Sequence, residues 1–148
     1  GPLARASGIA IDTRLAGRHG YDQLDVEPMV ETAGDCLARV LVRVREVEQS
    51  IGLVRQAVER MPKGDGQPID TKVRGMPAGE VFVRLEQPRG EVIYYVRANG
   101  TKYLERYRAR TPTFANVPSM IHLVKGVELA DVPNIILTID PCISCAER

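Results

Sequence analysis

The sequence has few large aromatic residues and few of the histidines and cysteines that build a metal site or a disulfide framework. It has no tryptophan, two phenylalanines, two histidines and three cysteines in 148 residues. A small, odd number of cysteines argues against the disulfide framework of a secreted domain and favours a reducing compartment. Neither His19 nor His122 stands at zinc-knuckle spacing from a cysteine. A self-contained zinc finger is therefore disfavoured.

An excess of one charge and a long apolar run are missing too. Lys and Arg number 20 against 19 Asp and Glu, giving a net charge of +1, so nothing in the charge favours nucleic acid as a partner. No run approaches the roughly 18 apolar residues of a membrane span, and no signal peptide opens the chain. The first residues, Gly1-Pro2, are not an initiator Met. We expect a single domain that is a piece of a longer polypeptide.

The strongest pattern present is a helical stripe. Pro28 suits a first turn and Pro62 ends the pattern, which predicts one helix over residues 27–61 after an extended lead-in over residues 1–26. At about 1.5 Å per residue the helix would be roughly 50 Å long, so we expect neighbouring helices or a partly uncovered stripe. The stripe consists of Val30, Ala33, Leu37, Val40, Val44, Val47, Ile51, Val54, Val58 and Met61.

Other side chains of this helix have ordinary structural interpretations. Cys36 lies beside the stripe, where a free cysteine packs as a small buried hydrophobe. The pairs Arg43/Glu46 and Arg55/Glu59 have the spacing of helix-surface ion pairs. We predict that these pairs form a solvated face.

After the helix and a polar loop over residues 62–79, the apolar period changes to two, which predicts a three-stranded antiparallel sheet within residues 80–109. The connections are Gln87–Gly90 and Asn99-Gly100, and Asn-Gly favours a two-residue hairpin turn. The expected strands are residues 80–86, 91–98 and 101–109.

Residues 113–148 are expected to form short helices and end in a tail. Thr113 or Asn116 could cap the first helix. Residues 131–140, "DVPNIILTID", fit either a short helix or a buried strand. The predicted fold class is α+β, mainly α, with one long helix, a small antiparallel three-stranded sheet and short C-terminal helices.

The most informative motif is the pair Cys142 and Cys145 in "DPCISC". A redox dithiol normally begins a helix that lowers the thiol pKa, and with three residues left after Cys145 we expect no such helix. A zinc ribbon would need a second ligand pair. Two interpretations stay open from the residues alone: inert thiols, or half of a metal site whose other ligands lie elsewhere.

Three segments together resemble one known family. They are "EQPRGEVIYYV" (86–96), "NGTKYLERYRARTPTFANVPSMIHLVKG" (99–126) and "DVPNIILTIDPCISC" (131–145). In order and spacing they resemble the C-terminal third of [NiFe] hydrogenase large subunits, above all the energy-converting and formate-hydrogenlyase branch. That branch is related to the 49-kDa quinone-site subunit of complex I. The opening "GPLARASGIAIDTR" (1–14) looks like the corresponding segment of both relatives.

The resemblance implies a nickel–iron cluster held in part by this chain. Cys142 would be a terminal thiolate ligand of nickel, and Cys145 would bridge nickel and iron, metals that soft sulfur ligands suit. Arg89, in the Pro88-Arg89-Gly90 turn, would hold its guanidinium over the open face of the metal pair. Asp140 would pair with Arg89, and both would have catalytic roles.

Pro88 and Arg148 would lie just outside the metal ligands. The branch is trimmed by a maturation protease after an arginine that matches Arg148. The family's other cysteine pair lies upstream, and no CxxC precedes Cys142 in this chain. We therefore expect no nickel–iron cluster, and no activity, in this fragment alone.

In the full-length protein the resemblance implies reversible dihydrogen oxidation. The implied partners are the missing N-terminal part of the subunit, an iron–sulfur small subunit, membrane subunits and the maturation protease. The implied location is cytoplasmic and peripheral, on the inner face of the cell membrane. The alternative is a complex I-type quinone-site or coupling subunit without nickel, a relative that lacks the two cysteines. A stand-alone interaction protein with an inherited fold is a third possibility.

Overall fold

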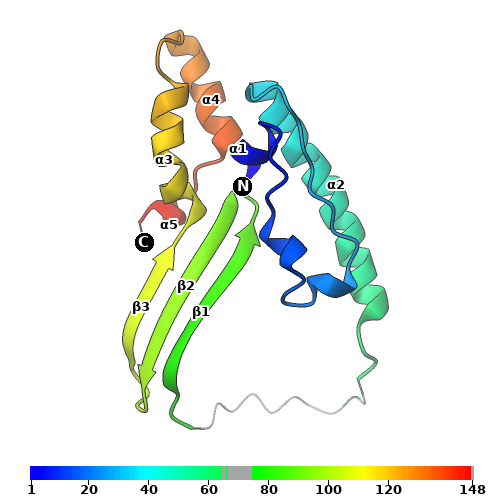
Figure 1. Ribbon diagram of the computed structural model, residues 1–148, viewed down its shortest axis with the longest axis vertical. Helices are drawn as coiled ribbons and strands as arrows, with labels where there is room; N and C mark the ends of the chain where they lie inside the picture. Colours follow the sequence, from blue (N-terminus) through cyan, green and yellow to red (C-terminus); the bar gives the residue numbers. More distant parts are fainter. Residues whose placement is uncertain (65, 67–74, 148) are drawn as a thin grey trace.

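The computed structural model describes residues 1–64, 66 and 75–147. Figure 1 shows the sheet, the long helix α2 and the α3–α4 pair as three arms that meet near the N-terminus. This arrangement confirms the predicted α+β class with one long helix and an antiparallel sheet. Arg148 and residues 65 and 67–74 of the predicted loop over residues 62–79 lie outside the described residues. The elements in order are α1 (Pro2–Arg5), η1 (Thr13–Ala16), η2 (Tyr21–Gln23), α2 (Cys36–Arg60), β1 (Ala78–Gln87), β2 (Gly90–Asn99), β3 (Leu104–Arg110), α3 (Pro112–Leu123), η3 (Leu129–Asp131), α4 (Val132–Ile139) and α5 (Ile143–Ala146).

Helix α2 is unbroken, as predicted, but it begins at Cys36 rather than near residue 27. The Asp35 carboxylate caps it by accepting a hydrogen bond from the Ala38 amide at 2.7 Å. Gly34, with a φ of +69°, stops the helix from extending backward, and its amide bonds to the Ala6 carbonyl at 2.8 Å. The segment before α2 therefore pairs with the lead-in instead of continuing the helix.

The apolar stripe of α2 is largely uncovered, as the sequence predicted for a helix of this length. Its members from Leu37 to Val58 and the adjoining Met61 are between 42% and 66% exposed. The stripe residues concerned are Leu37, Val40, Val44, Val47, Ile51, Val54, Val58 and Met61. The opposite side of α2 contributes Ala38 and Val42 to a small core with Ala6 and Met29. Cys36 is half-buried rather than buried, because it opens the helix.

Asp35→Ala is expected to lower the free energy of unfolding by about 1 kcal/mol, because the first turn of α2 loses its cap. Denaturant unfolding of the purified protein measures this loss. Asp131→Ala is the matched control: Asp131 is also an N-cap residue, of α4, but its side chain makes no capping bond. The control should change the free energy by less than about 0.5 kcal/mol. Equal losses in both variants would contradict the capping role.

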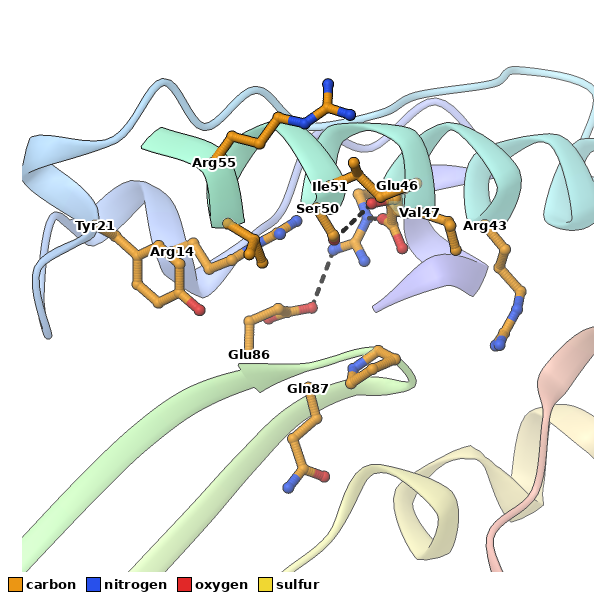
Figure 2. A pocket seen from close by; sticks show the side chains of 13 residues that line it. Arg14, Tyr21, Arg43, Glu46, Val47, Ser50, Ile51, Arg55, Glu86 and Gln87 are labelled. Carbon is orange, nitrogen blue, oxygen red and sulfur yellow. Dashed lines mark hydrogen bonds and ion pairs between the residues drawn. The ribbon is translucent and has the colours of Figure 1, made fainter. Parts of the chain in front are cut away.

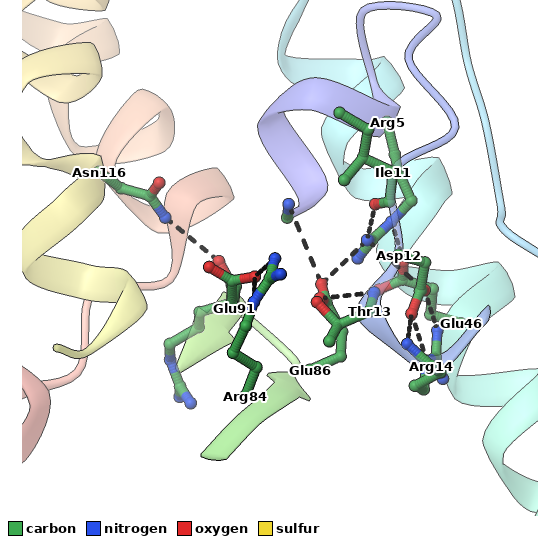
Figure 3. Close-up of polar contacts among 12 residues, drawn as sticks. Arg5, Ile11, Asp12, Thr13, Arg14, Glu46, Arg84, Glu86, Glu91 and Asn116 are labelled. Carbon is green, nitrogen blue, oxygen red and sulfur yellow. Dashed lines mark hydrogen bonds and ion pairs between the residues drawn. The ribbon is translucent and has the colours of Figure 1, made fainter. Parts of the chain in front are cut away.

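The lead-in is folded into the core, so the prediction of an extended segment over residues 1–26 was wrong. It forms α1, η1 and η2, and it buries Arg5 and Asp12. The Arg5 guanidinium contacts carboxylates from three segments of the chain, the lead-in, α2 and β1, as Figure 3 shows. Hydrophobic periodicity gives no sign of such a charged core. A segment without an apolar period can therefore still form short helices around a buried charge.

The sheet has the predicted order β1-β2-β3 and antiparallel pairing. Gln87 pairs with Gly90, which leaves Pro88 and Arg89 as the turn, called the hairpin tip below. The second connection is not the predicted two-residue turn. It runs from Asn99 to Leu104, where β3 begins. The Asn99 side chain accepts bonds from the Thr101 amide and hydroxyl, which favours this wider turn.

The C-terminal segment is helical, and residues 131–140 form a helix rather than a strand. Helix α3 begins at Pro112 after Thr111, so neither Thr113 nor Asn116 caps it. It packs against both α4 and α5. The single turn of α5 follows Cys142 where we expected no helix. Within the described residues, no helix combines the length and apolar character that a membrane span requires.

Candidate functional site

The candidate site lies where the hairpin tip meets the end of α4. Arg89 Nε donates a hydrogen bond to the backbone oxygen of Asp140 at 2.7 Å. Its Nη2 atom lies 3.1 Å from Asp140 Oδ2. The structure thus brings together the two residues that the sequence placed in one site. Their catalytic roles stay predictions.

Neighbouring segments hold the backbone of the hairpin tip at Arg89 in place. Gly90 has a φ of +130°, which side-chain-bearing residues rarely adopt. Asn116 of α3 donates its side-chain amide to the Arg89 carbonyl at 3.2 Å. A Cβ on Gly1 would lie 2.8 Å from the same carbonyl oxygen, so the lead-in packs closely against the tip. Contacts from α3 and from the lead-in therefore fix the backbone that carries Arg89.

Asp140 also contacts an arginine that the sequence did not single out. Arg43 Nη2 lies 2.7 Å from Asp140 Oδ2, so two guanidiniums share one carboxylate oxygen. The sequence predicted Arg43 as a partner of Glu46 on a solvated face. Glu46 instead contacts Arg5. A spacing pattern within one helix could not reveal a contact across 97 positions.

The cysteine pair is anchored to the start of α3. The Cys142 amide donates to Thr113 Oγ1 at 3.2 Å, and the Thr111 hydroxyl donates to the Cys145 carbonyl. Both threonines are buried. Cys142, Cys145 and Cys36 are free thiols. The sequence missed the anchoring role of Thr111 and Thr113, since polar residues at a helix start are usually caps.

The two thiols differ in acidity. The Ser144 hydroxyl, the amide and thiol of Cys145, and the Arg89 guanidinium together lower the pKa of Cys142 to about 7, and Ser144 contributes most. Burial raises the pKa of Cys145, and the nearby Cys142 thiol raises it further against the opposing effect of Arg89. Cys142 is therefore available as a thiolate near neutral pH, and the thiolate is the form that binds metal.

The donors present fit part of a nickel–iron site. Two thiol sulfurs on Cys142 and Cys145 supply the soft ligands that nickel and iron favour. Arg89 adds a cation next to them. Across residues 1–64, 66 and 75–147, no group of three or more His, Cys, Asp or Glu could hold a metal ion. The described donors thus match half of a four-sulfur ligand set. Arg148 lies outside the described residues.

A groove of about 610 Å³ adjoins the site between α2, the lead-in and the hairpin tip (Figure 2). Its lining includes the apolar residues Val47 and Ile51 together with Pro88 of the tip. A second groove of about 580 Å³ lies between α2 and α4. Arg43 lines both grooves. The site is therefore flanked by apolar surface on both sides of Arg43.

Comparison with known proteins gives the family. The family model described as "Respiratory-chain NADH dehydrogenase, 49 Kd subunit" matches residues 1–148. The chain belongs to this family. A carbon monoxide-induced hydrogenase of Rhodospirillum rubrum is 44% identical over 100% of this chain and 41% of its own length. An F(420)H(2) dehydrogenase component of Methanosarcina mazei is 37% identical over 100% of this chain and 41% of its own.

Two further relatives extend this range. An NAD(P)H-quinone oxidoreductase component of Synechocystis is 34% identical over 100% of this chain and 44% of its own length. A chain of a membrane-bound sulfane sulfur reductase, an archaeal respiratory membrane complex, superposes with a TM-score of 0.87 at 35% identity. That match covers 100% of this chain and 42% of the other.

The chain therefore spans less than half the length of these relatives. The resemblance stated from the sequence, to hydrogenase subunits related to the 49-kDa subunit of complex I, is confirmed at the level of the family. The relatives also include components of oxidoreductase complexes, one of them a respiratory membrane complex. Oxidoreductase activity is common to the names of these relatives, and several of them are subunits of larger complexes.

Proposed function

We propose that this chain is the part of a [NiFe] hydrogenase large subunit that carries the terminal cysteine pair. In the full-length protein it would contribute to reversible oxidation of dihydrogen. The observation that carries the proposal is the cysteine pair held against α3 with Arg89 beside it, paired to Asp140. The 44% identity to a carbon monoxide-induced hydrogenase supports it.

Each residue of the site has a distinct role in this proposal. Cys142 and Cys145 would supply thiolate ligands that hold the nickel–iron group. When bound, that group supplies adjacent redox-active metals for dihydrogen chemistry. Pro88 shapes the tip, and Arg89 keeps a cation near the thiolates. Asp140 orients the guanidinium through two contacts.

The proposal includes the rest of the complex. The remaining ligands would come from the missing N-terminal part of the subunit, so residues 1–148 alone are expected to be inactive. Electrons would pass to an iron–sulfur small subunit, and membrane subunits would hold the assembly at the inner face of the cell membrane. A maturation protease would cut after Arg148. These partners are consistent with relatives that belong to respiratory complexes.

A complex I-type function without nickel is the second candidate. It is favoured by the family model and by relatives that belong to NAD(P)H-quinone oxidoreductases. In that case the chain would help shape a quinone site, and its cysteines would be dispensable. Metal analysis of the full-length protein separates the two functions, because only the hydrogenase retains nickel.

Arg89→Lys in the full-length complex is expected to lower dihydrogen turnover by about 100-fold or more while nickel content stays near normal. Lysine keeps the positive charge but loses the planar fork that reaches both the backbone and the side chain of Asp140. Turnover with an artificial electron acceptor and nickel analysis of the same sample measure the two effects.

Arg84→Lys is the matched control for this variant. Arg84 lies on β1 close to the tip, and it pairs with Glu91 on the exposed sheet surface. Its replacement should leave both turnover and nickel content unchanged. Loss of nickel in Arg89→Lys would make Arg89 a structural residue. Unchanged turnover would refute its catalytic role.

A further inference from the structure

We infer that Arg43 is a positioning residue that holds Asp140 in place for both Arg89 and the cysteine pair. Its catalytic consequence rests on the proposed hydrogenase function, whereas its structural consequence does not. Arg43 comes from α2, Arg89 from the hairpin tip and Asp140 from the end of α4. The three residues join these elements through one carboxylate.

The two arginines make different contacts with Asp140. Asp140 Oδ2 is 2.7 Å from Arg43 Nη2 and 3.1 Å from Arg89 Nη2. Arg89 also donates Nε to the Asp140 backbone oxygen. Among the described residues, no group accepts a hydrogen bond from Arg89 Nη1. With Arg43 holding the shared oxygen, that edge of the Arg89 guanidinium stays free to face a ligand.

Asp140 needs to be held because its backbone is strained. Its φ of +56° is in the left-handed region, which residues other than glycine rarely occupy. It follows the last residue of α4 and precedes Cys142 by two positions. Any rotation of Asp140 would therefore move the cysteine pair along with the carboxylate.

Two side chains of α2, one helical turn apart, form hydrogen bonds with the end of α4. Arg39 is buried and donates Nε to Thr138 Oγ1 at 2.8 Å. Arg43, four residues later, bonds Asp140. Side chains at i and i+4 lie on the same face of a helix. The buried Arg39–Thr138 contact thus fixes the register in which Arg43 reaches Asp140.

Among the described residues, Asp140 is the one carboxylate that pairs with Arg43, and the buried Nη1 atom of Arg43 has no hydrogen-bond partner. Figure 2 shows the Arg43 side chain pointing away from Glu46 and Glu86, although Glu46 lies on the same helix and pairs with Arg5. Arg43 and Asp140 are 29% and 30% exposed, so the pair is partly shielded from water. Two cations against one carboxylate leave a net positive charge near the cysteine pair. That balance suits an anionic group bound there.

Amide hydrogen exchange of the full-length subunit tests the structural part directly. In Arg43→Gln, amide exchange across residues 142–146 should accelerate by about tenfold, because the segment loses one of its anchors. Arg45→Gln is the matched control: Arg45 lies on the same helix and pairs with Glu31 at the surface. It should leave exchange in this segment unchanged. Equal exchange in wild type and Arg43→Gln would overturn the inference.

A double-mutant cycle, measured by kcat, tests whether Arg43 acts through Asp140. Arg43→Gln should lower kcat for dihydrogen by about tenfold, with KM within about twofold and nickel content unchanged. In a protein that already carries Asp140→Asn, the added Arg43→Gln change should lower kcat by less than about twofold. A full effect of Arg43→Gln in that background would mean that Arg43 acts elsewhere. If the wild-type protein lacks nickel or turnover, the proposed function fails, and the exchange result still decides the role of Arg43.

Discussion

Cys142→Ser or Cys145→Ser in the full-length subunit is expected to abolish nickel retention and, with it, dihydrogen turnover. A neutral hydroxyl is a poor replacement for a thiolate as ligand to a soft metal. The effect at Cys142 should be large because its pKa of about 7 makes the thiolate readily available near neutral pH. Nickel and iron analysis of the purified complex measures the result.

Cys36→Ser is the control for these variants. Cys36 opens α2, where its sulfur accepts a hydrogen bond from Arg39 Nη2 at 3.0 Å. Its replacement should leave nickel content at the wild-type level. Full nickel occupancy in both Cys142→Ser and Cys145→Ser would refute the ligand assignment. A wild-type protein that reduces quinone without nickel would support the complex I-type function.

Arg5→Leu is expected to lower the free energy of unfolding by about 3–5 kcal/mol, the cost of leaving buried charges without their partner. Arg5 is 1% exposed. Its Nη1 atom bonds Glu86 at 3.0 Å and the Ile11 carbonyl at 2.9 Å. Its Nε atom lies 2.7 Å from Glu46 Oε1, and Asp12 is 3.5 Å from Nη1 (Figure 3). Carboxylates of the lead-in, α2 and β1 would lose one shared cation.

The loss should depend on pH in a defined direction. Burial already raises the pKa of Glu46 above its usual value, although Arg5 opposes the rise. Without Arg5 the folded-state pKa rises further above the unfolded value. A raised carboxylate pKa destabilises the folded state at neutral pH, and protonation relieves the cost as pH falls. The deficit of Arg5→Leu should therefore shrink between pH 7 and pH 5.

Denaturant unfolding at both pH values measures this deficit, with Arg84→Leu as the control. Arg84 is an exposed arginine paired with Glu91, and its replacement should cost less than about 1 kcal/mol with little dependence on pH. A deficit below about 1 kcal/mol for Arg5→Leu would show that the lead-in is not held by this cluster. A deficit that grows on acidification would contradict the role of the carboxylates.

Local patterns predicted the regular elements well. The steps of three and four predicted an unbroken long helix, and the period of two predicted three paired strands. The uncovered stripe on α2 followed from the length of the helix alone. The resemblance carried by "PRG" and "DPCISC" placed Arg89 beside Asp140, a contact that the structure contains. In each case the information lay in residues a few positions apart or in a known motif.

Boundaries and turns depended on contacts that such patterns do not contain. The apolar steps continue back to Val30, but α2 begins only after Gly34 and Asp35. The segment before it forms hydrogen bonds with the lead-in instead of continuing the helix. Asn99-Gly100 favoured a tight turn, yet the bonds of Asn99 with Thr101 stabilise a wider one. Tertiary and side-chain hydrogen bonds outweighed the local preference at both places.

By itself the sequence determined the helix, the strands and the cysteine pair, since each depends on neighbouring residues. Only the tertiary structure decided that Arg5 is the charged centre of the core and that Arg43 shares Asp140 with Arg89. Arginine and glutamate at helix spacing usually face water, so the sequence favoured an exposed Arg43–Glu46 pair. An arginine's long side chain takes whichever carboxylate the assembled fold brings near. Arg43 and Asp140 are 97 positions apart in the sequence, so no local pattern could predict their contact.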